Sequence, residues 1–334
     1  MAAHCFTPAH GSKATVPRVI RFASLLLAGA LAMPAEEWPT RAGVSGRVAV
    51  EVVEESFGDG RFLYQSEHFR YQADGRLSRN LVSDMAEVFE GTYAALEALP
   101  LPLRLAPAKG RTFDTLLFGD YASFIRAGGM PGSAGTYAGA RGIMLVPAQS
   151  LGLTPTSTGF RPGGATDYAI LVHEITHQVM HPMLHYLPVW FSEGIAEVME
   201  RQPYDRGRIH FRRFDLRRHL RDTLPHGDTL AILPPDRLYS LSNAAWNAGF
   251  GSSPAGLRNQ YFSAFLHAWY WLRLADDGDG ATIHRWLAAL TAGEPPVEAT
   301  ANLLLPDRDG LSLRTRMERA LSGSETGRRL IWLD

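Results

Sequence analysis

Two histidines and a glutamate at close spacing are the residues of this sequence best suited to chemistry. They form the segment His173-Glu174-Ile175-Thr176-His177, inside a mainly apolar run from Tyr168 to Met180 that contains no helix-breaking residue. This pattern predicts a buried helix on which the two histidines lie one turn apart on one face. Their imidazoles can therefore converge on one zinc ion, with Glu174 beside it as a general base.

The cysteine content limits how such a metal can be bound. The only cysteine, Cys5, lies near the N-terminus, which excludes a cysteine-based metal cluster in the main body of the chain. Any metal must therefore be held by histidine and carboxylate side chains. Two imidazoles are not enough for a zinc site, so a third ligand is needed.

A second motif, Leu187-Pro188-Val189-Trp190-Phe191-Ser192-Glu193-Gly194-Ile195-Ala196-Glu197, follows the first. The proline suits the start of a helix, and the two glutamates lie four residues apart on one face of that helix. Its apolar residues indicate a largely buried helix, in which an unpaired carboxylate would be unfavourable. Gly194 and Ala196 are small, as we expect for a helix packed closely against the first.

Together the two motifs resemble those of the gluzincin metallopeptidases, a zincin-like class, and most closely its secreted peptidase MA-like branch. The shared elements are H-E-x-x-H and W-x-x-E-G-x-A-E, with 15 residues between His177 and Glu193. The resemblance extends over about residues 60 to 292, with the strong motifs confined to 173–197. It implies one zinc ion per chain held by His173, His177 and Glu193, with Glu174 as general base and Glu197 as the carboxylate that orients His173.

Other ligand sets fit the spacing less well. Two helical turns separate His181 from His173, a rise of about 12 Å, which is too far for both to bind one ion. The metzincin pattern would need glycine at position 180 and histidine at position 183, and both are methionine. Within the resemblance Glu193 stands as the third ligand, and we expect His181 and His185 to be surface or loop histidines.

The resemblance also implies a hydrogen-bond donor to the oxyanion of a tetrahedral intermediate. In the aminopeptidase-like members this donor is a tyrosine that opens a helix about 60 to 70 residues after the glutamate ligand. Tyr261 lies 68 residues after Glu193, and we expect it to open a helix over residues 259–274. A purely structural role for Tyr261 stays open, in which case His267 or Tyr270 would supply the donor.

The elements that must position these residues predict an α+β fold. Strand-like stretches at residues 48–53, 62–71, 112–118 and 142–146 accompany one helix that begins after Ser78 and ends before Pro100. Helices over residues 166–181 and 188–201 follow, and later helices are expected near residues 214–223, 259–274, 281–292 and 311–321. We therefore predict a zincin-like core in which a mixed α/β part, residues 36–204, carries the zinc-binding helices, a mainly helical part spans residues 205–334, and a cleft lies between them.

Two segments before the zinc helix predict features of that cleft. The glycine-rich stretch 128–135 lacks phosphate-binding patterns, so we interpret it as a flexible loop near a cleft. The strand at 142–146 is the candidate edge strand along which an extended peptide could pair. No glutamate occurs between Glu97 and Glu174, so the residue with which the resembled aminopeptidases grip a free amine is missing. This favours an endopeptidase, unless Asp114 or Asp120 replaces that glutamate.

The first 35 residues predict export. Residues 1–21 carry three basic residues and no acidic one, and the 14 uncharged residues from Phe22 to Ala35 follow. This layout is typical of a signal peptide, residues 1–32, with cleavage after Ala32 or Ala35. The uncharged run is shorter than the roughly 20 residues of a spanning helix. We expect a periplasmic or secreted protein without stable membrane insertion.

The overall charge narrows the class of partner. The chain has 33 Lys and Arg against 34 Asp and Glu, a net charge of −1, so nothing in this balance favours nucleic acid. The expected function is zinc-dependent hydrolysis of peptide bonds in a peptide or protein substrate. Two alternatives remain: a zincin-fold protein that binds a peptide or partner without turnover, and a non-peptidase hydrolase that uses the same activated water. The presence of Glu174 counts against the first.

Overall fold

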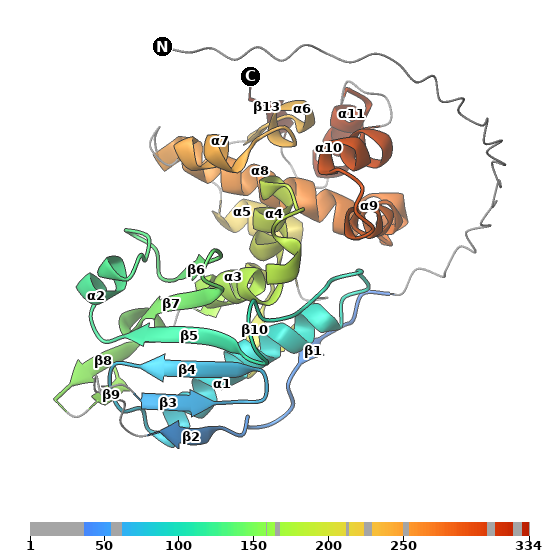
Figure 1. Ribbon diagram of the computed structural model, residues 1–334. Coiled ribbons are helices and arrows are strands. Elements are labelled where there is room, and N and C mark those ends of the chain that lie inside the picture. The colour runs from blue at the N-terminus through green and yellow to red at the C-terminus, as the bar shows by residue number, and fades with distance from the viewer. Residues whose placement is uncertain are drawn as a thin grey trace, which may run out of the picture. The chain divides into compact units, whose positions relative to one another are not determined.

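The protein has an α+β fold, in which a mixed sheet is followed by a mainly helical region (Figure 1). The computed structural model describes residues 37–54, 62–157, 159–163, 168–211, 214–223, 229–249, 254–305, 311–322 and 329–333. The predicted signal peptide lies outside these residues. None of the helices in the described ranges combines the length and the apolar character needed to cross a membrane.

Six strands form the main sheet in the order β2-β3-β4-β5-β7-β6 (Figure 1). Their bounds are β2 Glu51–Glu54, β3 Phe62–Gln65, β4 Phe69–Ala73, β5 Phe113–Phe118, β6 Thr136–Ala138 and β7 Ile143–Pro147. The pairs β2–β3, β3–β4 and β6–β7 are antiparallel, and β4–β5 and β5–β7 are parallel. The prediction of a mixed sheet is confirmed.

The edge of the sheet differs from the prediction. Residues 142–146 were expected to form the edge strand, but β7 lies inside the sheet between β5 and β6. The chain turns back after α2 (Tyr121–Arg126) to form β6, in which Tyr137 pairs with Met144 of β7. The short strand β6 is therefore the edge, because this hairpin covers the side of β7 that the prediction left free.

Helix α1 (Arg79–Glu97) confirms the predicted helix before Pro100. The Ser78 side chain caps it by accepting a hydrogen bond from the Leu81 N–H at 3.4 Å. On the sheet side, the Phe89 ring packs edge-on against Phe69 of β4, with the ring centroids 5.2 Å apart. α1 also packs against α3 (Tyr168–Val179), so the helix with the two histidines rests on both α1 and the sheet.

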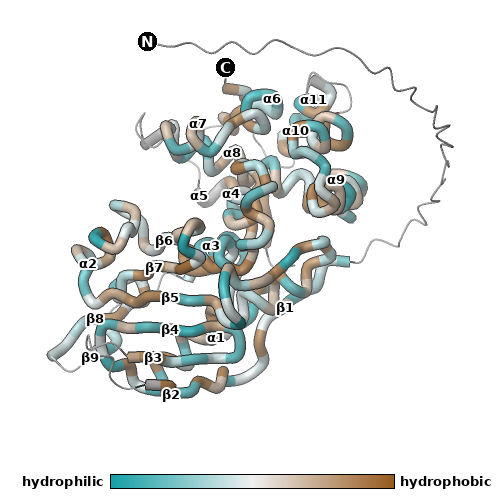
Figure 2. Tube along the Cα trace, in the orientation of Figure 1, coloured by the Kyte–Doolittle hydropathy of each residue, from teal (hydrophilic) through white to brown (hydrophobic). Residues whose placement is uncertain are grey.

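Helix α4 (Val189–Glu200) carries the second motif and begins directly after Pro188, as predicted. A 3₁₀ helix, His181–Met183, lies in the connection between α3 and α4. Apolar residues are frequent in α4 and along β7 in Figure 2, which agrees with the burial of both elements. α4 contacts α3 on one side and α8 on another, so it lies at the junction of the sheet part and the helical part (Figure 1).

The remaining helices build the C-terminal part. They are α5 Leu216–Thr223, α6 Pro235–Leu238, α7 Asn243–Ala248, α8 Pro254–Arg273, α9 Ala281–Thr291, α10 Pro296–Ala299 and α11 Leu311–Leu321. The short strands are β1 Ala42–Gly43, β8 Leu153–Thr156, β9 Gly159–Pro162, β10 Tyr204–Asp205, β11 Arg208–Ile209, β12 Thr229–Ile232 and β13 Arg329–Trp332. The boundary predicted between residues 204 and 205 falls inside β10, whose hairpin partner β11 also pairs with β1.

Gly194 shows why α4 can approach its neighbour closely. A Cβ atom at this position would lie 2.6 Å from the Ala264 carbonyl oxygen and 2.8 Å from the Ala268 Cβ, both on α8. Gly194 therefore serves the contact with α8, and the expectation that it serves the contact with α3 is wrong. Sequence spacing shows that a helix face is small, but not which neighbour lies against it.

We predict that Gly194→Ala destabilises the protein by about 1 to 3 kcal/mol, because the added methyl group overlaps α8. Urea unfolding followed by circular dichroism measures the change. Gly119→Ala is the matched control, since a Cβ there would meet only Phe160 ring atoms at 3.7 and 3.8 Å and Asp74 Cβ at 4.0 Å. Equal stability of the two variants would contradict the close contact between α4 and α8.

Candidate metal centre

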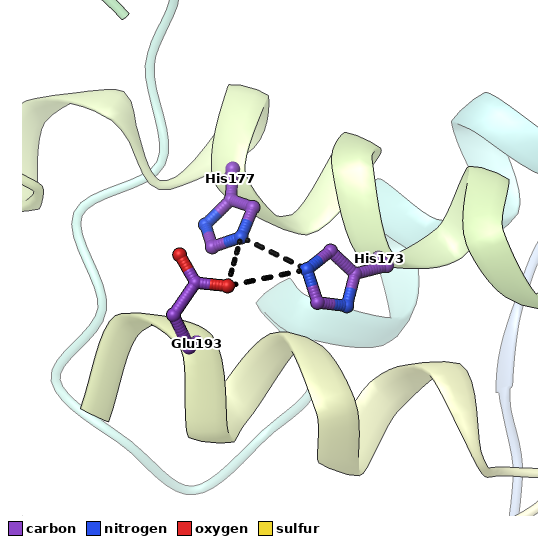
Figure 3. Close-up of side chains that lie close together, drawn as sticks. All are labelled: His173, His177 and Glu193. Carbon is purple, nitrogen blue, oxygen red and sulfur yellow. Dashed lines mark hydrogen bonds and ion pairs between the residues drawn. The ribbon is translucent and has the colours of Figure 1, made fainter. Parts of the chain in front are cut away.

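Three side chains from α3 and α4 converge on one point (Figure 3). The Nε2 atoms of His173 and His177 lie 3.2 Å apart. Glu193 Oε2 lies 3.4 Å from each of these nitrogens. Each residue thus offers one donor atom, and together these three atoms form a nearly equilateral triangle.

This triangle has the dimensions of one face of a zinc tetrahedron. Zinc binds imidazole nitrogen and carboxylate oxygen at about 2.05 Å, and the edge of a tetrahedron is about 1.63 times that bond length, or about 3.3 Å. The measured separations of 3.2, 3.4 and 3.4 Å match this value. The three residues therefore fit a tetrahedral zinc ion and leave its fourth position free.

The carboxylate in the triangle supports the same conclusion. Glu193 Oε2 is buried and has no hydrogen-bond partner among the described residues. Burial alone would raise the pKa of Glu193, but the charge of His177 and the polar contacts with both imidazoles hold that pKa well below its usual range. An ionised oxygen buried next to two imidazole nitrogens is a suitable donor set for a divalent cation.

The second ring nitrogen of His173 contacts a carboxylate that sequence analysis missed. His173 Nδ1 lies 3.0 Å from Glu200 Oε2 and 3.7 Å from Glu197 Oε1. Burial disfavours the charged imidazole, but the polar contact with Glu193, the hydrogen bond with Glu200 and the charge of Glu197 raise the pKa of His173 well above its usual value. When Nδ1–H donates to Glu200, the Nε2 lone pair is left to face the triangle.

Glu197 has a different main partner. Its carboxylate forms an ion pair with Arg201, one turn further along α4. The group His173, Glu197 and Glu200 also has metal-ligating atoms close together, but a cation there would meet the positive charge of Arg201. This group therefore suits orientation of His173 better than a second metal ion.

Helical periodicity could have included Glu200 among the candidates, although it could not have shown that Glu200 is the partner of His173. It follows Glu193 by seven residues and Glu197 by three, which places all three on one face of α4. The resemblance pointed to Glu197 because the matching motif ends there. The orienting role of Glu197 stays a prediction, whereas Glu200 is the carboxylate at hydrogen-bond distance.

Glu174 lies next to the triangle and is held by the edge strand. Its Oε2 accepts a hydrogen bond from the Tyr137 N–H at 2.8 Å. A Cβ at Gly135 would lie 3.2 Å from the Glu174 Cγ, so the glycine leaves room for this side chain. The Tyr137 hydroxyl also lies 2.6 Å from His181 Nδ1. Tyr137 therefore ties β6 both to α3 and to the 3₁₀ helix after it, and His181 contacts Tyr137 instead of the triangle.

The three residues of the triangle line a cavity of about 770 Å³, together with Glu174 and Tyr137. Its walls come from residues 130–133 and β6, from α3, the α3–α4 connection and α4, and from α7 and α8. The prediction that the glycine-rich stretch lies near a cleft is confirmed. Several hydrogen bonds shape this loop, among them that from the Met130 N–H to Thr136 Oγ1 at 2.9 Å.

Tyr261 reaches the cavity from α8. Its ring centroid lies 6.3 Å from that of His173, and it packs edge-on against Trp246 at 5.3 Å. Burial, followed by the negative charge of Glu193, raises the pKa of Tyr261, so its hydroxyl stays protonated and can donate. The expectation that Tyr261 opens its helix is wrong, because α8 already begins at Pro254, a residue suited to a first helical turn.

The two alternative donors lie elsewhere. The ring nitrogens of His267 contact the Leu233 carbonyl oxygen and the Tyr239 hydroxyl, each at 3.0 Å, and burial lowers the pKa of His267 to about 3. Tyr270 is only 5% exposed. Neither is among the described residues that line the cavity. We call the three candidate ligands His173, His177 and Glu193 the metal group. Of the three candidate donors, the fold brings only Tyr261 to this group.

No model of a known protein family matches the chain, and a comparison with curated proteins finds no match. The functional argument therefore depends on the donor geometry, the cavity and the motifs.

We predict that Glu200→Gln weakens zinc binding by about 10 to 100-fold, since the carboxylate that fixes His173 is replaced by a neutral amide. Competition with a chromogenic chelator measures the dissociation constant. Glu197→Gln is the control on the same helix, and it should change zinc affinity less while it lowers the free energy of unfolding through loss of the Arg201 ion pair. The opposite order of zinc affinities would return the orienting role to Glu197.

Proposed function

We propose that this protein is a zinc-dependent peptidase of the gluzincin type that hydrolyses peptide bonds outside the cytoplasm. The observation that carries the proposal is a donor triangle of tetrahedral dimensions beside an independently held carboxylate, Glu174, inside one cavity. The two motif helices lie between a mixed sheet and a helical part, an arrangement that suits the zincin-like core implied by the motifs.

The residues take distinct roles in this proposal. His173, His177 and Glu193 would hold the metal, which when bound supplies an activated water of pKa near 7 and polarises a carbonyl group. Glu174 takes a proton from the attacking water and later donates it to the departing amine. Because the Tyr137 N–H holds Oε2 of this carboxylate, Oε1 is the oxygen available for proton transfer.

Tyr261 is the proposed donor to the oxyanion. Its place in the cavity lining next to His173 and its protonated hydroxyl support this role. A neutral hydroxyl donates a hydrogen bond to developing negative charge without giving up its proton.

The cavity favours internal peptide bonds over chain ends. An exopeptidase needs a charged group to hold a free amine or a free carboxylate. Asp114 instead pairs with Arg70 at 2.7 Å, and Asp120 caps α2 through the Ser123 N–H. Neither is among the described cavity residues, so the fold removes both aspartates that could have replaced the missing glutamate.

The two alternatives keep the same site and differ in what it does. A binding protein without turnover would not need a carboxylate beside the metal group. Glu174 lies there and is held by a hydrogen bond from the edge strand. A non-peptidase hydrolase would use the same groups on another carbonyl or ester. The edge strand β6 lines the cavity, so an extended ligand such as a peptide can lie along it, which favours a peptide.

We predict that the wild-type protein binds one zinc ion per chain and cleaves peptides, and that a chelator abolishes the cleavage. Glu174→Gln should keep the zinc and lower turnover by about 10² to 10⁴-fold, because it removes the proton acceptor and no ligand. Elemental analysis and a fluorogenic peptide assay measure the two properties. The exposed Glu298→Gln is the matched control. Absence of zinc from the wild type, or full activity of Glu174→Gln, would overturn the proposal.

We predict that Tyr261→Phe lowers turnover by about 10²-fold, with zinc content and melting temperature nearly unchanged, because only the oxyanion donor is lost. Tyr270→Phe makes the same chemical change outside the cavity and should leave turnover near the wild-type value. Equal turnover of the two variants would assign Tyr261 to packing alone.

A further inference from the structure

The cavity beside the metal group has an uncharged lining. Apart from His173, His177, Glu193 and Glu174, the described residues that line it are aliphatic, aromatic, hydroxyl, amide or glycine residues. Charged residues make up 20% of the whole chain, so this lining differs from the average composition of the protein.

One wall of the cavity is apolar. Leu184, Leu187 and Val189 line it from the connection that joins His177 to Glu193. Leu187 and Val189 are 6% and 7% exposed, whereas Leu184 is half-buried. Leu184 therefore offers the more accessible side chain of this wall. On the loop before β6, Met130 is 44% exposed and adds a flexible apolar side chain.

The polar part of the lining can form hydrogen bonds but cannot neutralise charge. Asn243 and Asn247 lie four residues apart on α7, are exposed and line the cavity. Their amides suit the N–H and C=O groups of a peptide. At the metal group, the negative charges of Glu193 and Glu174 would balance a bound divalent cation, which would leave no net charge to attract a charged side chain.

These features have one consequence for recognition. A charged side chain that enters the cavity loses part of its hydration and meets no opposite charge in return, which is unfavourable. An apolar side chain gains by contact with Leu184. We infer that the cavity selects peptide segments with uncharged side chains next to the scissile bond, one of which, apolar, lies against Leu184. This inference rests on the proposed peptidase function.

A peptide library tests the selection directly. The zinc-loaded protein is incubated with peptides that vary over all 20 side chains around a central bond, and mass spectrometry identifies the cleaved bonds. Asp, Glu, Lys and Arg should be depleted by about 10-fold or more on both sides of the cleaved bond, relative to Leu, Val and Phe. Cleavage next to charged and neutral side chains at equal frequency would overturn the inference.

Substitution of Leu184 tests its part in the selection. Leu184→Ala should lower the preference for large apolar side chains at one position by about 10-fold, and Leu184→Arg should raise the acceptance of Asp and Glu at the same position. Leu184→Met conserves volume and apolar character and should keep the wild-type profile. Zinc content and melting temperature confirm that each variant is folded. An unchanged profile in both Leu184→Ala and Leu184→Arg would overturn the role of Leu184.

A binding measurement separates this inference from the proposed function. If the zinc-loaded protein cleaves no peptide in the library, the proposed function fails, and fluorescence anisotropy then measures the binding of labelled peptides that differ only in Leu, Lys or Asp at their centre. Binding of the Leu peptide at least about 10-fold more tightly than the other two would support the uncharged preference without turnover. Equal binding of the three peptides, or binding of none, would overturn it.

Discussion

The burial of the Glu193 carboxylate against two imidazoles is the interaction on which the rest of the site depends. A buried carboxylate is unfavourable unless positive charge compensates it, so α4 must hold Glu193 within 3.4 Å of both nitrogens. α4 also packs against α8, which it approaches closely at Gly194. On the Nδ1 side of His173, the Glu200 carboxylate lies at hydrogen-bond distance. Glu197 lies nearby and forms an ion pair with Arg201. The metal group is thus the meeting point of three packed helices.

The second constraint comes from the sheet edge. Because β6 pairs with β7 on one side only, the outward Tyr137 N–H is free to hold the Glu174 carboxylate. The Tyr137 side chain reaches His181 in the 3₁₀ helix that follows α3. Tyr137 therefore fixes the distance between the Glu174 carboxylate and the edge of the sheet. In the proposed function, this hydrogen bond would hold the general base beside the edge of the sheet.

The cavity contains both the candidate metal ligands and the side chains on which the proposed substrate preference depends. The α3–α4 connection both brings Glu193 to the histidines and supplies the apolar wall, so the position of the candidate ligand and the proposed substrate preference depend on the same short segment. Tyr261 and Trp246 close the opposite side from α8 and α7. The helical part thereby completes the cavity that α3 and α4 begin, and it contributes the Tyr261 side chain, whose pKa is raised by burial.

Sequence alone determined the local features of this protein. The 3.6-residue period placed His173 and His177 on one face of α3 and predicted the extent of α1 and α4 to within one or two residues, because these patterns depend only on neighbours along the chain. Tertiary structure decided which strand is the edge, which helix Gly194 contacts and which carboxylate bonds His173. It also decided that Tyr261, and neither His267 nor Tyr270, reaches the cavity. Each of these outcomes depends on contacts between residues far apart in sequence, and the periodicity of a single segment carries no information about its partner.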